Sequence, residues 1–164
     1  MTYLITFTCY GSHLHGSEDG SVDRRHAVPG TPVLERDPSR LAVEEERMVQ
    51  PPYALDRARR ATVLAAIQEV CAHRGWQLIA AHVRATHVHL IVEAEVSPER
   101  MMTDFKAYAS RRLNRMGLDE RNRRRWTRHG STRWLRGAQS ISAAVEYVVR
   151  EQGQPMAVFE SGER

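Results

Sequence analysis

The chain has 164 residues, of which 41% are hydrophobic, and this length and composition fit one globular domain with a buried core. Its formal net charge is only +4. No apolar run approaches the ~18 residues that a membrane-spanning helix needs, which argues against a membrane protein.

The N-terminal part predicts one strand followed by a long irregular segment. Residues 2–11, TYLITFTCYG, are rich in β-branched and aromatic residues and end at a glycine. They lack the basic start and the cleavage site of a secretion signal, so we expect a cytoplasmic location. Residues 12–52 show little periodicity, and so long a segment indicates a functional insertion within a single domain over residues 1–164.

Residues 56–94 predict a helix followed by a hairpin. Asp56 can cap a helix whose apolar residues recur at helical spacing, and Gly75 supplies the stop. Residues 76–83, WQLIAAHV, and residues 86–94, THVHLIVEA, then form two adjacent strands. The two cysteines of the chain are isolated and flanked by apolar residues, which favours buried thiols over a disulfide or a zinc site.

The remaining residues predict two more helices with an arginine-rich loop between them. One helix begins at Ser97 and ends before Gly117, and the last runs from about Ser140 to Gln152. The order β-α-β-β-α followed by a helix predicts an α+β fold. We expect a ferredoxin-like or RRM-like antiparallel sheet with helices on one face and a C-terminal helix that carries a tyrosine.

Basic residues are concentrated in one segment of the chain. Between Arg100 and Arg136 there are twelve basic and three acidic residues, so the rest of the chain is net acidic. Such a block favours a surface for a polyanion, above all nucleic acid. The alternative is that 23 arginines and a single lysine reflect coding bias and are simply solvated.

Two histidines lie two residues apart on the second predicted hairpin strand. Side chains alternate along a strand, so His87 and His89 face one way while Val88 and Leu90 face the other. Two imidazoles in this arrangement can reach one divalent ion. The pair alone is weak support for a metal site, because the chain has eight histidines and a His-x-His pattern arises by chance.

The last predicted helix offers a compatible partner. Ile141, Val145 and Val148 form its packed stripe, whereas Tyr147 and Glu151 lie one turn apart on the neighbouring stripe. A tyrosine and a carboxylate so placed can act as nucleophile and metal ligand if the helix covers the sheet face that bears the histidines. The alternative is a core aromatic and a solvated charge at the helix end.

Taken together, these motifs resemble the single-tyrosine HUH transposases, which mobilise insertion sequences as single-stranded DNA and include the REP-associated tyrosine transposases. HVH fits the family's His-hydrophobic-His motif, FKAYASRRLN resembles its lysine-containing helix, and YVVREQG resembles its tyrosine helix. The resemblance covers the opening strand and most of residues 56–153. It leaves residues 12–52 unexplained.

The resemblance implies a definite chemistry. In this family two histidines and a polar residue on the tyrosine helix bind Mg²⁺ or Mn²⁺, which polarises the scissile phosphate. The tyrosine attacks that phosphate and leaves a 5′-phosphotyrosine and a free 3′-OH. Attack by another 3′-OH reverses the step and rejoins strands. A cation is what a phosphodiester needs as negative charge develops on it.

Carried over to this sequence, the resemblance makes Tyr147 the nucleophile and His87 and His89 metal ligands. The third ligand is Glu151, four residues after the tyrosine, where the family commonly has Gln or Asn. Gln152 stays open as an alternative, although a further ~100° of rotation about the helix axis turns it towards the apolar stripe.

Tyr108 is a rival nucleophile, but its place on a stripe with Met101 and Phe105 fits the core. The resemblance also gives the basic segment a role, since phosphate contacts would hold single-stranded or hairpin DNA and Trp126 or Trp134 could stack on bases. Core packing is the alternative for both tryptophans. The expected DNA-binding residues are Lys106, Arg111, Arg112, Arg123, Arg124, Arg125 and Trp126.

We therefore expect a metal-dependent DNA strand transferase that acts on hairpin-bearing single strands, as a homodimer and without a membrane partner. One alternative is a domesticated or inactive relative that binds structured nucleic acid without cutting it. Another is a metal-dependent phosphodiesterase that uses water, which would need the metal but not Tyr147.

Overall fold

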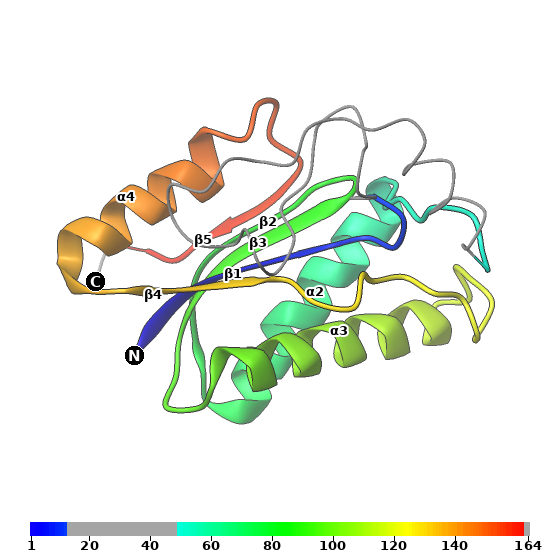
Figure 1. The fold of residues 1–164 in the computed structure, drawn as a ribbon, viewed down its shortest axis with the longest axis horizontal. Helices are drawn as coiled ribbons and strands as arrows, with labels where there is room; N and C mark the ends of the chain where they lie inside the picture. Colours follow the sequence, from blue (N-terminus) through cyan, green and yellow to red (C-terminus); the bar gives the residue numbers. More distant parts are fainter. Residues whose placement is uncertain (13–48, 163–164) are drawn as a thin grey trace.

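A five-stranded antiparallel sheet runs through the computed structural model, which describes residues 1–12 and 49–162 (Figure 1). The strands are β1 (Thr2–Thr8), β2 (Gln77–Val83), β3 (His87–Glu93), β4 (Ser131–Leu135) and β5 (Ala157–Glu160). Their order across the sheet is β4-β1-β3-β2-β5. Most of the expected insertion, residues 13–48, lies outside the described residues.

Helices α2 (Arg57–Arg74), α3 (Pro98–Arg115) and α4 (Gly137–Arg150) accompany the sheet. The predicted helix signals are confirmed: the Asp56 carboxylate accepts the N–H of Arg59 at 2.9 Å, and Gly75 ends α2 with a left-handed φ of 72°. In the two described ranges, no helix combines the length and the apolar character that crossing a membrane requires.

The larger part of the core lies between the sheet and the helices α2 and α3. Val88 and Leu90 of β3 join Phe7 of β1 in this cluster, all fully buried. Cys9 and Cys71 belong to it as free thiols, as the sequence predicted. Burial raises the pKa of both thiols to about 12, so neither is a thiolate at neutral pH.

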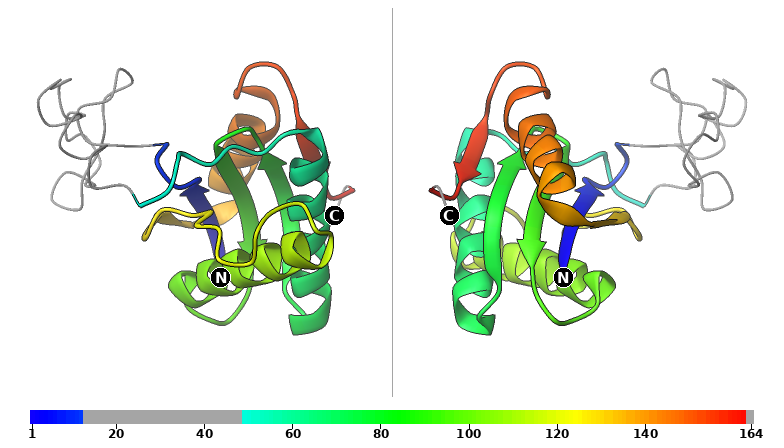
Figure 2. Two further views of the ribbon diagram at one scale, coloured as in Figure 1. Left: turned by 90° about the vertical axis from the view of Figure 1, so that its right-hand side faces the viewer. Right: turned by 90° about the vertical axis from the view of Figure 1, so that its left-hand side faces the viewer.

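A smaller apolar cluster fixes α4 to the opposite face of the sheet (Figure 2). Ile91 of β3 packs there with Ala144 and Val148 of α4. The predicted α+β fold is confirmed, and the structure adds that α4 is the one helix of the described ranges on this face. Because β3 alternates, the side of the strand that carries Ile91 also carries His87 and His89.

The two edge strands were not predicted. β4 lies inside the expected arginine-rich loop and pairs with β1, while β5 follows α4 and pairs with β2. Both are short, at five and four residues. Through β4, the arginine-rich segment becomes part of the sheet edge beside α4 (Figure 1).

Candidate active site

Three aromatic rings meet between the sheet and α4. The imidazoles of His87 and His89 stack with their ring centroids 6.0 Å apart and an interplanar angle of 12°. The ring of Tyr147 from α4 meets His89 edge-on, with the centroids 6.1 Å apart. The structure therefore brings the predicted nucleophile within one side chain's reach of a predicted metal ligand.

His89 is held in the state that a metal ligand requires. Burial lowers the pKa of His89 to about 4, with the nearby charges of His87, His82 and Arg84 as further causes, so its ring is neutral at pH 7. Its Nδ1 makes a 3.1 Å hydrogen bond with the Thr6 hydroxyl. Its Nε2 makes no hydrogen bond with the described residues, which leaves that nitrogen for coordination.

A threonine hydroxyl also orients the other histidine of the pair. Nδ1 of His87 lies 2.8 Å from the hydroxyl oxygen of Thr86. Hydrogen bonds of this kind on one ring nitrogen set the tautomer and the direction of the other. Neither Thr86 nor Thr6 was predicted to take part, because a threonine on a strand carries no distinguishing sequence signal.

Sequence reasoning also missed His82, which fixes the end of the tyrosine helix. Its fully buried ring donates from Nδ1 to the carbonyl oxygen of Val148 at 2.9 Å and accepts the N–H of Met156 at Nε2 at 3.0 Å. Burial lowers the pKa of His82, in keeping with the neutral ring that both bonds require. The register of the predicted hairpin could have pointed to His82, since this residue pairs with His89 across the two strands.

The third predicted ligand does not lie with the histidines. Glu151 is exposed at the end of α4, where its N–H donates to the carbonyl oxygen of Tyr147 at 3.3 Å. The Gln152 amide donates to the same carbonyl at 3.2 Å. Among the described side chains, no three His, Cys, Asp or Glu residues form a group that could hold a metal ion.

A cavity of about 470 Å³ opens beside His89 and Tyr147. The sheet supplies Thr6, Ser131 and Arg133 to its wall, and α4 supplies Ser140 as well as Tyr147. Tyr147 is 42% exposed, so its phenol is accessible from this cavity. The rival Tyr108 sits on α3 against the larger core cluster, on the other side of the sheet.

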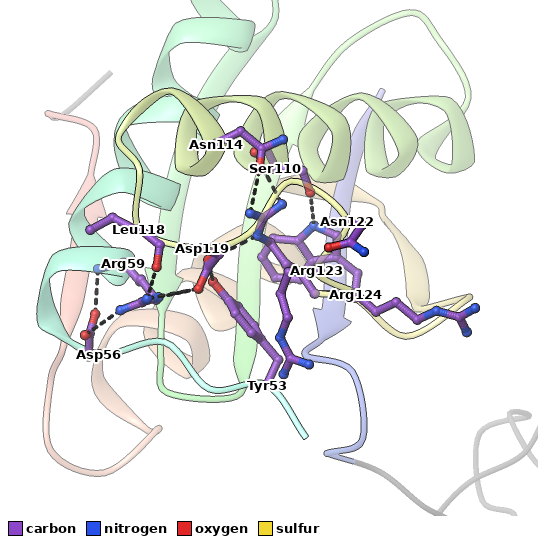
Figure 3. Close-up of polar contacts among 12 residues, drawn as sticks. Tyr53, Asp56, Arg59, Ser110, Asn114, Leu118, Asp119, Asn122, Arg123 and Arg124 are labelled. Carbon is purple, nitrogen blue, oxygen red and sulfur yellow. Dashed lines mark hydrogen bonds and ion pairs between the residues drawn. The ribbon is translucent and has the colours of Figure 1, made fainter. Parts of the chain in front are cut away.

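Arg125 of the arginine-rich segment belongs to a largely buried polar cluster around Asp119 (Figure 3). The Asp119 carboxylate accepts from Tyr53 at 2.5 Å, from Arg59 at 2.9 Å and from Arg125 at 3.3 Å. Arg125 is 3% exposed and donates also to Asn114 at 2.7 Å. Burial favours the protonated acid, but the hydrogen bonds to the three donors outweigh it and lower the pKa of Asp119.

Lys106 and Trp126 are also tied into the fold. The Lys106 ammonium donates to the carbonyl oxygens of Thr127 and His129 at 3.0 and 3.1 Å, and burial lowers its pKa. The Trp126 indole N–H donates to Ser110 at 2.9 Å, and its ring packs against the core. Like Arg125, these side chains have structural partners, and their part in DNA binding stays a prediction.

The other four expected DNA contacts lie nearer the surface. Arg112 pairs with Glu69 at 2.6 Å, and Arg123 donates to Pro51 and covers the ring of Tyr53. The guanidinium of Arg111 lies 4.7 Å from the ring centroid of Tyr108. The Arg124 side chain extends away from the Asp119 cluster (Figure 3).

Comparison with known proteins adds a family match. The model of the family described as "Transposase IS200 like" matches residues 53–151, a range that includes the histidine pair, Tyr147 and Glu151. A solved structure of a REP-associated tyrosine transposase bound to a REP hairpin is 14% identical, with a TM-score of 0.49. That alignment covers 92% of this chain and 65% of the other. Among curated proteins, none matches the sequence.

Proposed function

Because the chain belongs to the IS200-like transposase family, we propose that it is a metal-dependent DNA strand transferase that cleaves and rejoins single-stranded, hairpin-bearing DNA. One observation carries the proposal: the ring of Tyr147 lies 6.1 Å from that of His89, although the two come from different elements on either side of the arginine-rich segment. The accessible phenol stands beside a neutral imidazole, which is what attack on a metal-bound phosphate requires.

The reaction begins when the Tyr147 oxygen attacks the scissile phosphorus. A bond forms between that oxygen and phosphorus, the bond from phosphorus to the 3′ oxygen breaks, and the 3′ oxygen leaves with a proton as a free 3′-OH. The phenol loses its own proton in the same step. The downstream strand stays on the protein as a 5′-phosphotyrosine, and attack by another 3′-OH restores a phosphodiester without an external energy source.

His87 and His89 fit two positions of a divalent metal site. They share one face of β3, a threonine hydroxyl orients each ring, and His89 is neutral. Bound Mg²⁺ or Mn²⁺ would neutralise charge on the scissile phosphate. Glu151 is the proposed third ligand, and it must approach the histidines to complete the site, since it does not lie with them here. Gln152 stays the alternative.

The protein would act in the cytoplasm as a homodimer on single-stranded or hairpin DNA, from one transposase-like domain over residues 1–164 with 12–52 as an insertion. Arg111 and Arg124, at the surface, are the first candidates for phosphate contacts among the seven expected residues. The Asp119 cluster would act indirectly, by holding the loop that presents Arg124.

The position of Glu151 favours a second candidate function. Away from the histidines, it leaves the pair without a third His, Cys, Asp or Glu ligand among the described residues, an arrangement that would suit a relative that binds structured nucleic acid without cutting it. Because Tyr147 still faces His89, we place this function second.

One assay separates these functions. Single-stranded hairpin DNA labelled at its 3′ end is incubated with the protein and Mn²⁺ and run on a denaturing gel. We expect a labelled protein-DNA adduct that disappears with Tyr147→Phe, His89→Asn or a chelator, and that persists with the control Tyr108→Phe. Binding without any adduct supports the second function. Cleaved DNA without an adduct, unaffected by Tyr147→Phe, supports a water-using phosphodiesterase.

A further inference from the structure

The cavity beside Tyr147 exists because the facing stripe of α4 is small. Ser140, Ala143 and Ala144 precede Tyr147 at intervals of seven, four and three residues, so all lie on one side of the helix. Short side chains there leave an open groove between α4 and the edge of the sheet. The groove therefore runs from the first turn of α4 to the proposed nucleophile.

The register of the strands places the side chains that form the sheet wall of this groove. Ser131 of β4 pairs with Thr6 of β1, and Thr6 pairs with His89 of β3, so the three form one row across the sheet. Arg133 follows Ser131 by two residues on the same face of β4, a step of about 7 Å along the strand. Arg133 thus lies next to the row that ends at the proposed metal ligand.

The charge of the groove is that of a site for an anion. Arg133 is the one arginine or lysine among the described residues that line it, and no Asp or Glu of those residues does so. Arg133 is exposed and makes no ion pair with another described residue. Arg59, Arg112 and Arg125 elsewhere in the chain each have a carboxylate partner.

We propose that this groove binds a phosphate of the DNA strand next to the scissile phosphate, with the Arg133 guanidinium as its main contact. A guanidinium can donate two parallel hydrogen bonds to one phosphate, and the hydroxyls of Ser131 and Ser140 supply further donors. The assignment rests on the proposed function, since it takes Tyr147 and His89 as the place of the scissile phosphate.

Holding the neighbouring phosphate would set the register of the strand. A strand fixed at Arg133 presents one particular phosphate to Tyr147, whereas a strand held only at distant arginines can slide. Arg133 would then contribute to affinity and to the choice of the bond that is cut.

Binding is tested without chemistry, in Tyr147→Phe protein with fluorescent single-stranded DNA and anisotropy as the readout. We expect Arg133→Gln to weaken binding about tenfold and to lower the slope of log affinity against log salt by about 0.7, the value for one phosphate contact on a single strand. The control is Arg100→Gln, which removes the same charge from an exposed residue in the first turn of α3, a helix on the other face of the sheet. It should change affinity less than twofold.

A substrate series locates the contact. Each phosphate around the scissile one is replaced in turn by an uncharged methylphosphonate. One position should weaken binding with Arg133 present and have no effect in Arg133→Gln, as in a double-mutant cycle. The proposal is overturned if Arg133→Gln binds as tightly as Arg100→Gln, or if its response to every replacement matches that of the parent.

The outcome is independent of the adduct assay. An adduct with no Arg133 dependence of affinity leaves the transferase standing and removes the groove assignment. Arg133-dependent binding without an adduct shows that the groove holds a phosphate, but it removes the transferase and with it the position of that phosphate next to a scissile one. Because Arg133 is exposed, its substitution should not unfold the chain, and equal thermal midpoints of the two arginine variants check this.

Discussion

Two polar regions on opposite faces of the sheet use their charges differently. Around Asp119, the carboxylate and its partners Arg59 and Arg125 are joined by hydrogen bonds, and their side chains are mostly buried (Figure 3). Beside α4, Tyr147 and Arg133 are exposed, and Arg133 has no carboxylate partner among the described residues. The charged groups around Asp119 bind one another, whereas Tyr147 and Arg133 beside α4 are accessible to a ligand.

The difference shows why local charge is a poor guide to the site. Twelve basic residues between Arg100 and Arg136 predicted a DNA surface, yet Lys106 and Arg125 are used inside the fold. Arg133 belongs to the same segment but reaches the groove because β4 carries it to the sheet edge. The absence of a carboxylate partner among the described residues, rather than a basic neighbourhood, is what led us to propose Arg133 as a DNA contact.

The strongest test of the contrast is Asp119→Ala. It leaves the buried Arg125 guanidinium without its carboxylate, which should lower the free energy of unfolding by about 4 kcal/mol. Urea unfolding measures the loss. At saturating DNA, adduct yield per folded molecule should stay within about twofold, because Asp119 lies on the other side of the sheet from Tyr147 and the loop that it holds is proposed to contribute to DNA affinity alone. A loss below about 1 kcal/mol would contradict a structural role for the Asp119 cluster.

Acid should affect the two regions in sequence. The folded-state pKa of His89 is about 4, below its usual 6.5, so the unfolded chain binds the extra proton first. The protonation of His89 therefore does not change the free energy of unfolding above pH 6.5, and it lowers this free energy by about 3 kcal/mol as pH falls to 4. The pKa of Asp119 is instead lowered by folding. The ionised carboxylate therefore stabilises the fold above its usual pKa of 3.8, and this stabilisation is lost as pH falls below that value.

Unfolding free energies measured between pH 7 and 3, with a chelator present, separate these windows. His89→Asn should reduce the loss between pH 6.5 and 4, whereas Asp119→Asn should leave that loss and reduce the one below pH 4. Equal pH profiles for the two variants would contradict the assignment of different roles.

A smaller effect is expected at His82. His82→Leu leaves the carbonyl of Val148 and the N–H of Met156 without their partner, which should cost about 2 kcal/mol of stability. Because Val148 adjoins Tyr147, adduct formation should also slow, by about tenfold. His82→Asn keeps an N–H donor for Val148 and should recover part of the rate. No recovery, with stability restored, would show that His82 only supports the fold.

Sequence patterns predicted the parts of the molecule that depend on regular spacing. The caps at Asp56 and Gly75, the hairpin, and the shared face of His87 and His89 all follow from local periodicity. The meeting of Tyr147 with His89 also follows, once α4 covers that face. Apart from the placement of α4 on the sheet, each of these rests on a residue's position within its own element.

The rest depends on contacts between distant segments. β4 is a five-residue edge strand whose arginine and serine hide the alternation, so it was taken as loop. The partial burial of Lys106 and Trp126 follows from the path of residues 117–130 back over α3, which no local pattern encodes. Helical spacing favoured Glu151 over Gln152 as the third ligand, but α4 ends at Arg150, so neither residue lies within the helix and their order as ligands stays a prediction.

The central claim is that Tyr147 is the residue that joins DNA, and the attachment site tests it directly. The adduct is trimmed with nuclease, digested with trypsin and analysed by mass spectrometry. Trypsin cuts after arginine and lysine, so Tyr147 lies in the peptide 137–150 and the rival Tyr108 in the peptide 107–111, each with a single tyrosine. We predict that the nucleotide is found on peptide 137–150. A nucleotide on peptide 107–111, or no modified peptide at all, would contradict the account.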